Sequence, residues 1–151
     1  MSRIHISYYS KDWRGAILSN LQSSPFVLDD IRMLCVESLV QATHFDDWRH
    51  VSCFGISGPE CKAMMYEVED EGVAYWKGMV MKWGGEEHLD LLRRGLEAKF
   101  DQFELAREAL IDSVGSELTY DVPASDLFLS YPPFKFLGDL NEIRRSLVER
   151  R

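Results

Sequence analysis

The sequence predicts a single domain of the α+β class, mainly α-helical with a few short β-strands. The length of 151 residues suits one hydrophobic core, and 46% hydrophobic residues are enough to fill it. The clearest apolar patterns have helical spacing, whereas alternating stretches of β-favouring residues are short. The chain contains no low-complexity segment and no internal repeat, so we expect one compact domain over residues 1–151.

The N-terminal part predicts short strands followed by a helix. Residues 4–9 read I-H-I-S-Y-Y, an alternating pattern typical of a strand, and residues 11–15 then turn the chain. The Ser-Ser-Pro sequence at 23–25 breaks any helix, and residues 26–28 can pair as a second short strand. Asp29 and Asp30 provide a turn into a helix over about residues 33–45.

This helix separates its residues into two faces. One face is apolar, with spacing i, i+3, i+4, i+7, and consists of Val36, Leu39, Val40 and Thr43. A neighbouring face carries Glu37, Gln41 and His44, so a carboxylate, an amide and an imidazole project in one direction. Such a face can form a functional site. The simpler interpretation is a polar stripe that meets solvent.

The middle of the chain predicts one helix and one ambiguous segment. Ser57 and Glu60 match a capping box that begins a helix over about residues 58–68, with Pro59 in the first turn. Residues 73–83 are rich in aromatic residues and Met but have no clean period. They fit an irregular helix, or a lid lying over a pocket.

The second half contains the strongest helical signals. A first helix is predicted over residues 86–100 and a second over 102–114, ending at Gly115. The apolar positions that mark them are Leu89, Leu92, Leu96 and Phe100, then Phe103, Ala106, Leu110 and Val114. Residues 117–122 predict a short strand, 123–133 a loop, and 138–149 a final helix.

Charge and composition limit the possible partners and compartments. With 17 Lys and Arg against 25 Asp and Glu, the net charge is −8, which disfavours nucleic acid binding without a local basic patch. No run is long enough to span a membrane and no signal peptide is apparent, so we expect a cytoplasmic protein. Three cysteines without a C-x-x-C motif indicate buried or free thiols.

A metal site receives little support from the sequence. His50, Cys53 and Cys61 could be considered as zinc ligands, but their spacing matches no common ligand pattern. We therefore expect neither a metal nor a cofactor.

The order of short motifs resembles that of the NADAR family, also called YbiA-like, over nearly the whole chain. The central motif is a Glu-His-x-x-Gln-Ala-x-Lys-Phe helix, which here reads E-S-L-V-Q-A-T-H-F over residues 37–45. The other matching positions are Gly15, Leu18-Ser19-Asn20, Trp83, Leu96 to Phe100, Asp126 and Leu137-Gly138-Asp139-Leu140. Each motif is short, but their order and intervals agree with the family pattern.

The resemblance implies a ribose phosphate pocket and hydrolysis of an N-glycosidic bond. The substrate would be a pyrimidine intermediate of riboflavin synthesis, or ADP-ribose attached to a base, including ADP-ribosylated nucleic acid. Departure of a base from ribose needs one carboxylate near the sugar and a second acid at the leaving group. Glu37 and Asp126 would form that catalytic pair. The ligand-binding residues would be Ser19, Asn20, Gln41, His44 and Trp83, the last as a flat surface for a base.

Several positions depart from the family pattern. Ser38 replaces its His, and His44 replaces its Lys, which removes any mechanism in which an amine captures the sugar as an imine. Glu67 lies near the position of its Arg, and Lys135 precedes Phe136 where the family has Asn-Arg. Exchange of an Arg for a Glu should weaken anion binding.

Three functions therefore remain open. The first is an N-glycosidase, favoured by Glu37 and Asp126. The second is a catalytically degenerate protein that binds or sequesters a nucleotide-like or ADP-ribose-like ligand, favoured by the departures. The third is an interaction module whose Glu37 face meets a partner or solvent.

Overall fold

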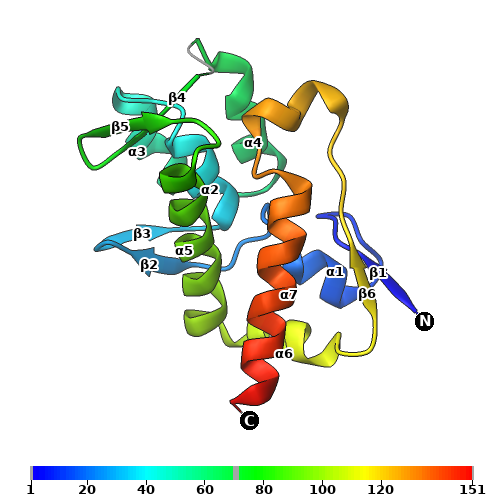
Figure 1. The fold of residues 1–151 in the computed structure, drawn as a ribbon. Coiled ribbons are helices and arrows are strands. Elements are labelled where there is room, and N and C mark those ends of the chain that lie inside the picture. The colour runs from blue at the N-terminus through cyan, green and yellow to red at the C-terminus, as the bar shows by residue number, and fades with distance from the viewer. Residues whose placement is uncertain (1, 70–71, 151) are drawn as a thin grey trace.

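The computed structural model describes residues 2–69 and 72–150, which form an α+β domain (Figure 1). The α-helices are α1 (Trp13–Leu18), α2 (Val36–Ala42), α3 (Trp48–Phe54), α4 (Gly58–Lys62), α5 (Glu86–Gln102), α6 (Glu104–Asp112) and α7 (Pro133–Glu149). Two 3-10 helices, η1 (Ala63–Glu67) and η2 (Ala124–Leu129), complete the helical part. The strands are β1 (Arg3–His5), β2 (Phe26–Leu28), β3 (Ile31–Met33), β4 (Val73–Trp76), β5 (Met79–Lys82) and β6 (Glu117–Thr119).

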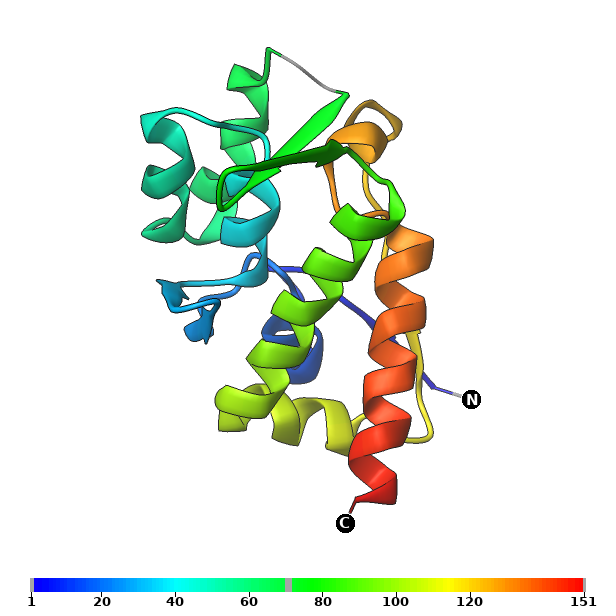
Figure 2. The same cartoon turned by 60° about the vertical axis from the view of Figure 1, so that its left-hand side comes forward.

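Helices α5 and α7 lie side by side along the molecule in both ribbon views (Figures 1 and 2). The predicted helices over 86–100 and 102–114 are confirmed as α5 and α6, and Leu92, Leu96 and Phe100 of α5 are fully buried. Helix α2 packs closely on α5 at Gly95, where an added Cβ would lie only 2.4 Å from Leu39 Cδ2. The long helix therefore supports the short one that carries Glu37.

Helix α2 is shorter than the predicted helix over 33–45. Residues 31–33 instead form strand β3, which pairs antiparallel with β2. Asp29 and Asp30 make the tight turn between them, with φ values of 51° and 67°. This left-handed conformation suits a two-residue hairpin turn, which reverses the chain before α2 can begin. Predicted strand 26–28 is confirmed as β2.

The segment 73–83 is a β-hairpin and not an irregular helix. The alternative of a lid lying over a pocket stays a prediction. Strands β4 and β5 pair antiparallel around Lys77 and Gly78, which both have positive φ. The main-chain N–H of Tyr75 donates to the Thr43 carbonyl oxygen at 2.8 Å, which attaches the hairpin to the end of α2.

Several further helical segments differ from expectation. Helix α1 begins within the segment 11–15 that we expected to turn the chain, and helix α3 lies where no helix was predicted. Each begins at an aspartate that accepts a main-chain N–H: Asp12 from Arg14 and Asp47 from Arg49. The helix over 58–68 is present as α4 followed by η1, but Ser57 makes no side-chain capping bond, so the capping box is absent. Helix α7 begins at Pro133, earlier than the predicted 138, and the loop before it contains η2.

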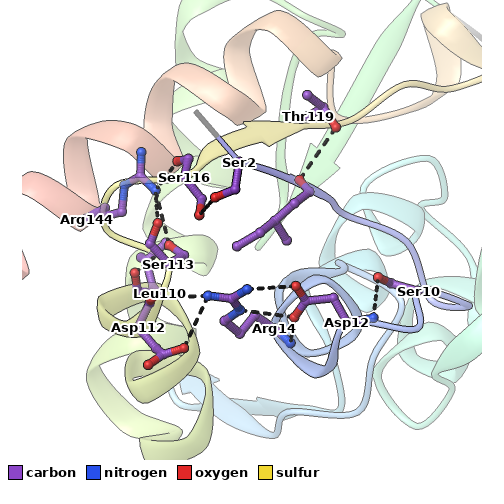
Figure 3. A network of polar contacts seen from close by, with 11 residues as sticks. Ser2, Ser10, Asp12, Arg14, Leu110, Asp112, Ser113, Ser116, Thr119 and Arg144 are labelled. Atoms are coloured by element: carbon purple, nitrogen blue, oxygen red, sulfur yellow. Dashed lines mark hydrogen bonds and ion pairs between the residues drawn. The ribbon is translucent and has the colours of Figure 1, made fainter.

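Strand β1 near the N-terminus pairs in parallel with strand β6 from the second half of the chain. Figure 3 shows the polar contacts around them: Arg14 binds Asp12 and Asp112, while Arg144 donates to the carbonyl oxygens of Ser113 and Ser116. The predicted strand over 117–122 is thus shorter, at residues 117–119. Within the two described ranges, we find no helix with the length and apolar character needed to cross a membrane.

Candidate functional site

A cavity of about 440 Å³ lies between the N-terminal segment, helices α2 and α4, and η2. Four of the predicted site residues contribute to its walls: Ser19, Asn20, Glu37 and Asp126. They come from the end of α1, the first turn of α2, and η2. The fold therefore brings both predicted catalytic carboxyl groups to one cavity.

Glu37 is positioned by main-chain and side-chain contacts. Its N–H donates to the Asn20 carbonyl oxygen at 2.9 Å, and its carboxylate accepts a 2.8 Å hydrogen bond from Gln41 Nε2, one turn along α2. The side chain is 5% exposed. Burial raises the pKa of Glu37 above 4.5, and the negative charge of Asp126 adds to this, although the Gln41 bond and the Lys62 charge oppose it. Glu37 therefore favours its protonated form more than a free glutamate does.

Asp126 has a different environment in the same cavity. Its Oδ2 lies 3.3 Å from the Lys62 ammonium nitrogen, and its Oδ1 accepts a 3.1 Å hydrogen bond from Ser125 Oγ. Lys62 is the last residue of α4 and also lines the cavity. The two carboxyl groups thus have distinct partners, an amide for Glu37 and an ammonium for Asp126.

Two polar side chains of the cavity have no partner among the described residues. Both amide atoms of Asn20, Nδ2 and Oδ1, are buried and make no hydrogen bond, and the same is true of Ser130 Oγ. Buried polar atoms in proteins are nearly always paired, so these atoms are available to a ligand or to water. An amide and a hydroxyl in this position can bind sugar hydroxyl groups.

The mouth of the cavity is aromatic. Tyr9 and Tyr66 are 75% and 79% exposed, and Tyr8 and Tyr120 also contribute to the walls. Sequence analysis did not identify these tyrosines or Lys62, since they belong to three separate segments and no local pattern marks them. A planar ring can stack on such side chains.

Gln41, His44 and Trp83 lie outside the cavity walls. Gln41 is fully buried behind Glu37 and acts through its hydrogen bond to that residue. The rings of His44 and Trp83 stack on each other at 3.8 Å with an interplanar angle of 12°, so this face of Trp83 is covered by protein. The expected role of Trp83 as a flat surface for a base in this cavity is therefore not supported by its position.

His44 instead supports η2. Its Nε2 donates a 3.0 Å hydrogen bond to the carbonyl oxygen of Leu129, the last residue of that helix. Burial lowers the pKa of His44 to about 4, which keeps the ring neutral near pH 7. His44 thus holds the segment that carries Asp126 and does not line the cavity.

The departures at Glu67 and Lys135 also lie away from the cavity. Glu67 is exposed on η1, and Lys135 pairs with Asp139 on α7 at 2.6 Å. Lys62 therefore supplies positive charge to a wall where we expected acidic character from Glu67. The three cysteines are free and buried, and His50 Nδ1 bonds to the carbonyl oxygens of Ala42 and Phe45.

Comparison with known proteins gives one informative result, at the level of the fold. No protein-family model matches the sequence, and no curated protein matches it. The structure is similar to the NMR structure of the E. coli protein YbiA, with a TM-score of 0.69 and 18% sequence identity. The similarity covers 99% of this chain and 86% of YbiA. The chain therefore has a YbiA-like fold.

Proposed function

We propose that this protein is an N-glycosidase that hydrolyses the bond between ribose and the base of a ribosylated base or nucleotide-like compound. The observation that carries this proposal is the pair of carboxyl groups in one cavity: a buried Glu37 with a raised pKa and an Asp126 paired with Lys62. Two carboxyl groups in contrasting environments are the usual means of acid and base catalysis at a glycosidic bond.

The reaction assigns a separate task to each group. The bond between C1′ and the base nitrogen breaks, the electron pair goes to the base, and the Glu37 carboxyl group donates a proton to it. A water molecule adds to C1′ and transfers a proton to Asp126, whose charge also stabilises the oxocarbenium-like transition state. The products are a free base and a ribosyl compound with a hydroxyl group at C1′.

The remaining wall residues fit a ligand of this type. A volume of about 440 Å³ lies within the range of small-molecule sites. The unpaired amide of Asn20 and hydroxyl of Ser130 can bind ribose hydroxyl groups, and Tyr9 or Tyr66 can stack on the base. Both types of ligand considered from the sequence, riboflavin-pathway intermediates and ADP-ribosyl adducts, share a ribosyl group linked to nitrogen.

The alternative is a catalytically inactive protein that binds a nucleotide-like ligand. The observation in its favour is that Asp126 is already engaged by Lys62 and Ser125. A carboxylate whose oxygens are already occupied by an ammonium and a hydroxyl group is less free to hold an attacking water molecule. In such a protein, Lys62 and Asn20 would bind the ligand and the glycosidic bond would remain intact.

Mass analysis of products distinguishes the two functions. The protein is incubated with ribosylated pyrimidine intermediates, nucleotides and ADP-ribosylated bases, and Glu37→Gln is compared with Glu67→Gln, the same change at an exposed position outside the cavity. We expect a free base from at least one compound with the unmodified protein and with Glu67→Gln, but not with Glu37→Gln. Ligand binding without release of a base would support the binding protein instead. If no compound is bound or cleaved, both functions are rejected.

A further inference from the structure

Lys99 is a fully buried lysine whose ammonium group is directed at main-chain oxygens. It lies in α5 with 0% exposure, and its Nζ donates to the carbonyl oxygens of Ile17 at 2.9 Å and Ser19 at 3.2 Å. These carbonyl groups belong to the last turn and the C-terminal cap of α1. A cation at the C-terminus of a helix interacts favourably with the helix dipole.

The position of Lys99 is energetically demanding. In the part of the chain that the structure describes, no carboxylate forms an ion pair with it. Burial lowers the pKa of Lys99 to about 7, and the Coulombic effect of Cys35 opposes this. An apolar side chain would fill the same space in α5 without this desolvation. The hydrogen bonds that Lys99 makes are therefore the feature that needs explanation.

These bonds lead directly to the cavity. Ser19, whose carbonyl oxygen accepts from Lys99, is followed by Asn20, and both residues line the cavity. The Asn20 carbonyl oxygen in turn accepts the N–H of Glu37. A short path of covalent and hydrogen bonds thus connects Lys99 to the Asn20 amide and to the first turn of α2. Lys99 itself is not among the residues that line the cavity.

We infer that Lys99 is a positioning residue: by holding the Ser19 main chain, it fixes the position of Asn20 in the cavity wall and the main chain of Glu37. The inference rests on the proposed function in one respect: the positions of Asn20 and Glu37 matter because they belong to the proposed site. The geometry itself can be measured in the protein without any ligand, so failure of the proposed reaction and failure of the inference are distinguishable.

The test uses Lys99→Met and Lys99→Arg, with Arg144→Met as a matched control. Arg144 also donates to two main-chain carbonyl oxygens after a helix, those of Ser113 and Ser116, but the loop that it holds lies near strands β1 and β6 (Figure 3). Each protein is labelled with ¹⁵N, and NMR follows the side-chain amide of Asn20 and the hydrogen exchange of the Glu37 N–H. Thermal unfolding of each variant reports its global stability.

In Lys99→Met we expect a shifted Asn20 side-chain resonance and Glu37 N–H exchange faster by at least about tenfold, beyond the change in global stability. Lys99→Arg should restore much of the wild-type signal, because it keeps donors for the two carbonyl groups. Arg144→Met should leave both probes unchanged.

Wild-type Asn20 and Glu37 signals in folded Lys99→Met would overturn the inference, as would equal changes in Arg144→Met. If Lys99→Met does not fold, Lys99→Gln takes its place: its shorter side chain loses the ammonium group, so it must shift the Asn20 resonance, and an unchanged resonance rejects the positioning role.

Discussion

The Lys62 ammonium nitrogen lies 3.3 Å from Asp126 Oδ2 and joins two walls of the cavity that are distant in sequence. Lys62 comes from α4 and Asp126 from η2. The positive charge of Lys62 also lowers the pKa of Glu37, but the burial of Glu37 has a larger effect and raises it. One cation therefore acts on both carboxyl groups of the proposed site.

The first prediction concerns this cation. Lys62→Met should raise the pKa of Glu37 further and weaken the binding of ADP-ribose, because the wall loses its positive charge. Its effect on unfolding should be about 1 kcal/mol or less, since the ion pair is partly solvent-exposed. Titration of the Glu37 carboxyl group by ¹³C NMR and calorimetry with ADP-ribose at two salt concentrations measure these effects. Lys82→Met, on an exposed strand, is the control, and equal behaviour of the two variants would refute the role of Lys62.

The second prediction concerns the core. Leu96 is fully buried in α5, so Leu96→Ala should lower the free energy of unfolding by about 2–5 kcal/mol. Leu105 of α6 is 43% exposed, so Leu105→Ala should change the free energy of unfolding much less. Chemical denaturation measures both. A loss below about 0.5 kcal/mol for Leu96→Ala would contradict the packing of α5.

The third prediction concerns acid stability. Burial lowers the pKa of His44 from 6.5 to about 4, so the folded protein binds fewer protons than the unfolded chain between these values. Stability from this residue is complete above pH 6.5 and is lost as the pH falls toward 4, by about 3 kcal/mol at most. His44→Phe keeps a ring against Trp83 and should reduce the acid sensitivity. Part of the acid sensitivity should remain in this variant, because burial also lowers the pKa of His88 to about 4.

Unfolding measured from pH 7 to pH 4.5 tests this assignment. As the pH falls, the free energy of unfolding of wild type should decrease relative to that of His44→Phe. A difference that stays constant across this range would show that the His44 ring is not desolvated.

The parts of the fold that could be predicted are those specified by local pattern. Helices α5 and α6 have apolar residues at regular helical spacing, and Phe26 to Leu28 are flanked by residues that break helices. The hairpin of β4 and β5 has no such pattern, because β5 exposes the apolar side chains of Met79 and Val80 while the small Ala74 of β4 is buried. Asp29 and Asp30 could be recognised as a turn, but not as a hairpin turn, since this depends on pairing of β2 with β3.

In the candidate site, too, some residues could be predicted from local spacing, and others are brought to the site only by packing of distant segments. The spacing of Glu37 and Gln41 predicts that they share a helix face, and their hydrogen bond confirms it. The cavity placement of Asn20 and Asp126 was expected from the motif order. Lys62 could not be identified, because its role arises only when α4 packs opposite η2. The sequence also does not reveal that the His44 ring covers one face of Trp83.

The catalytic role of Glu37 can be tested with one conservative variant. Glu37→Gln keeps the size of the side chain and can still accept the hydrogen bond from Gln41, but it cannot donate the proton. Because the folded pKa of Glu37 is raised, its contribution to stability is complete below pH 4.5 and is lost as the pH rises through the folded value. Removal of the charge should therefore leave stability at pH 7 equal to or above that of the wild type.

The most direct measurement is the single-turnover rate of base release by Glu37→Gln, combined with its thermal unfolding. The proposed mechanism predicts that the rate falls by about 100-fold or more while ligand binding and Tm are retained. Full activity in a normally folded Glu37→Gln protein would contradict the assignment of Glu37 as the proton donor, and with it the location of the reaction in this cavity.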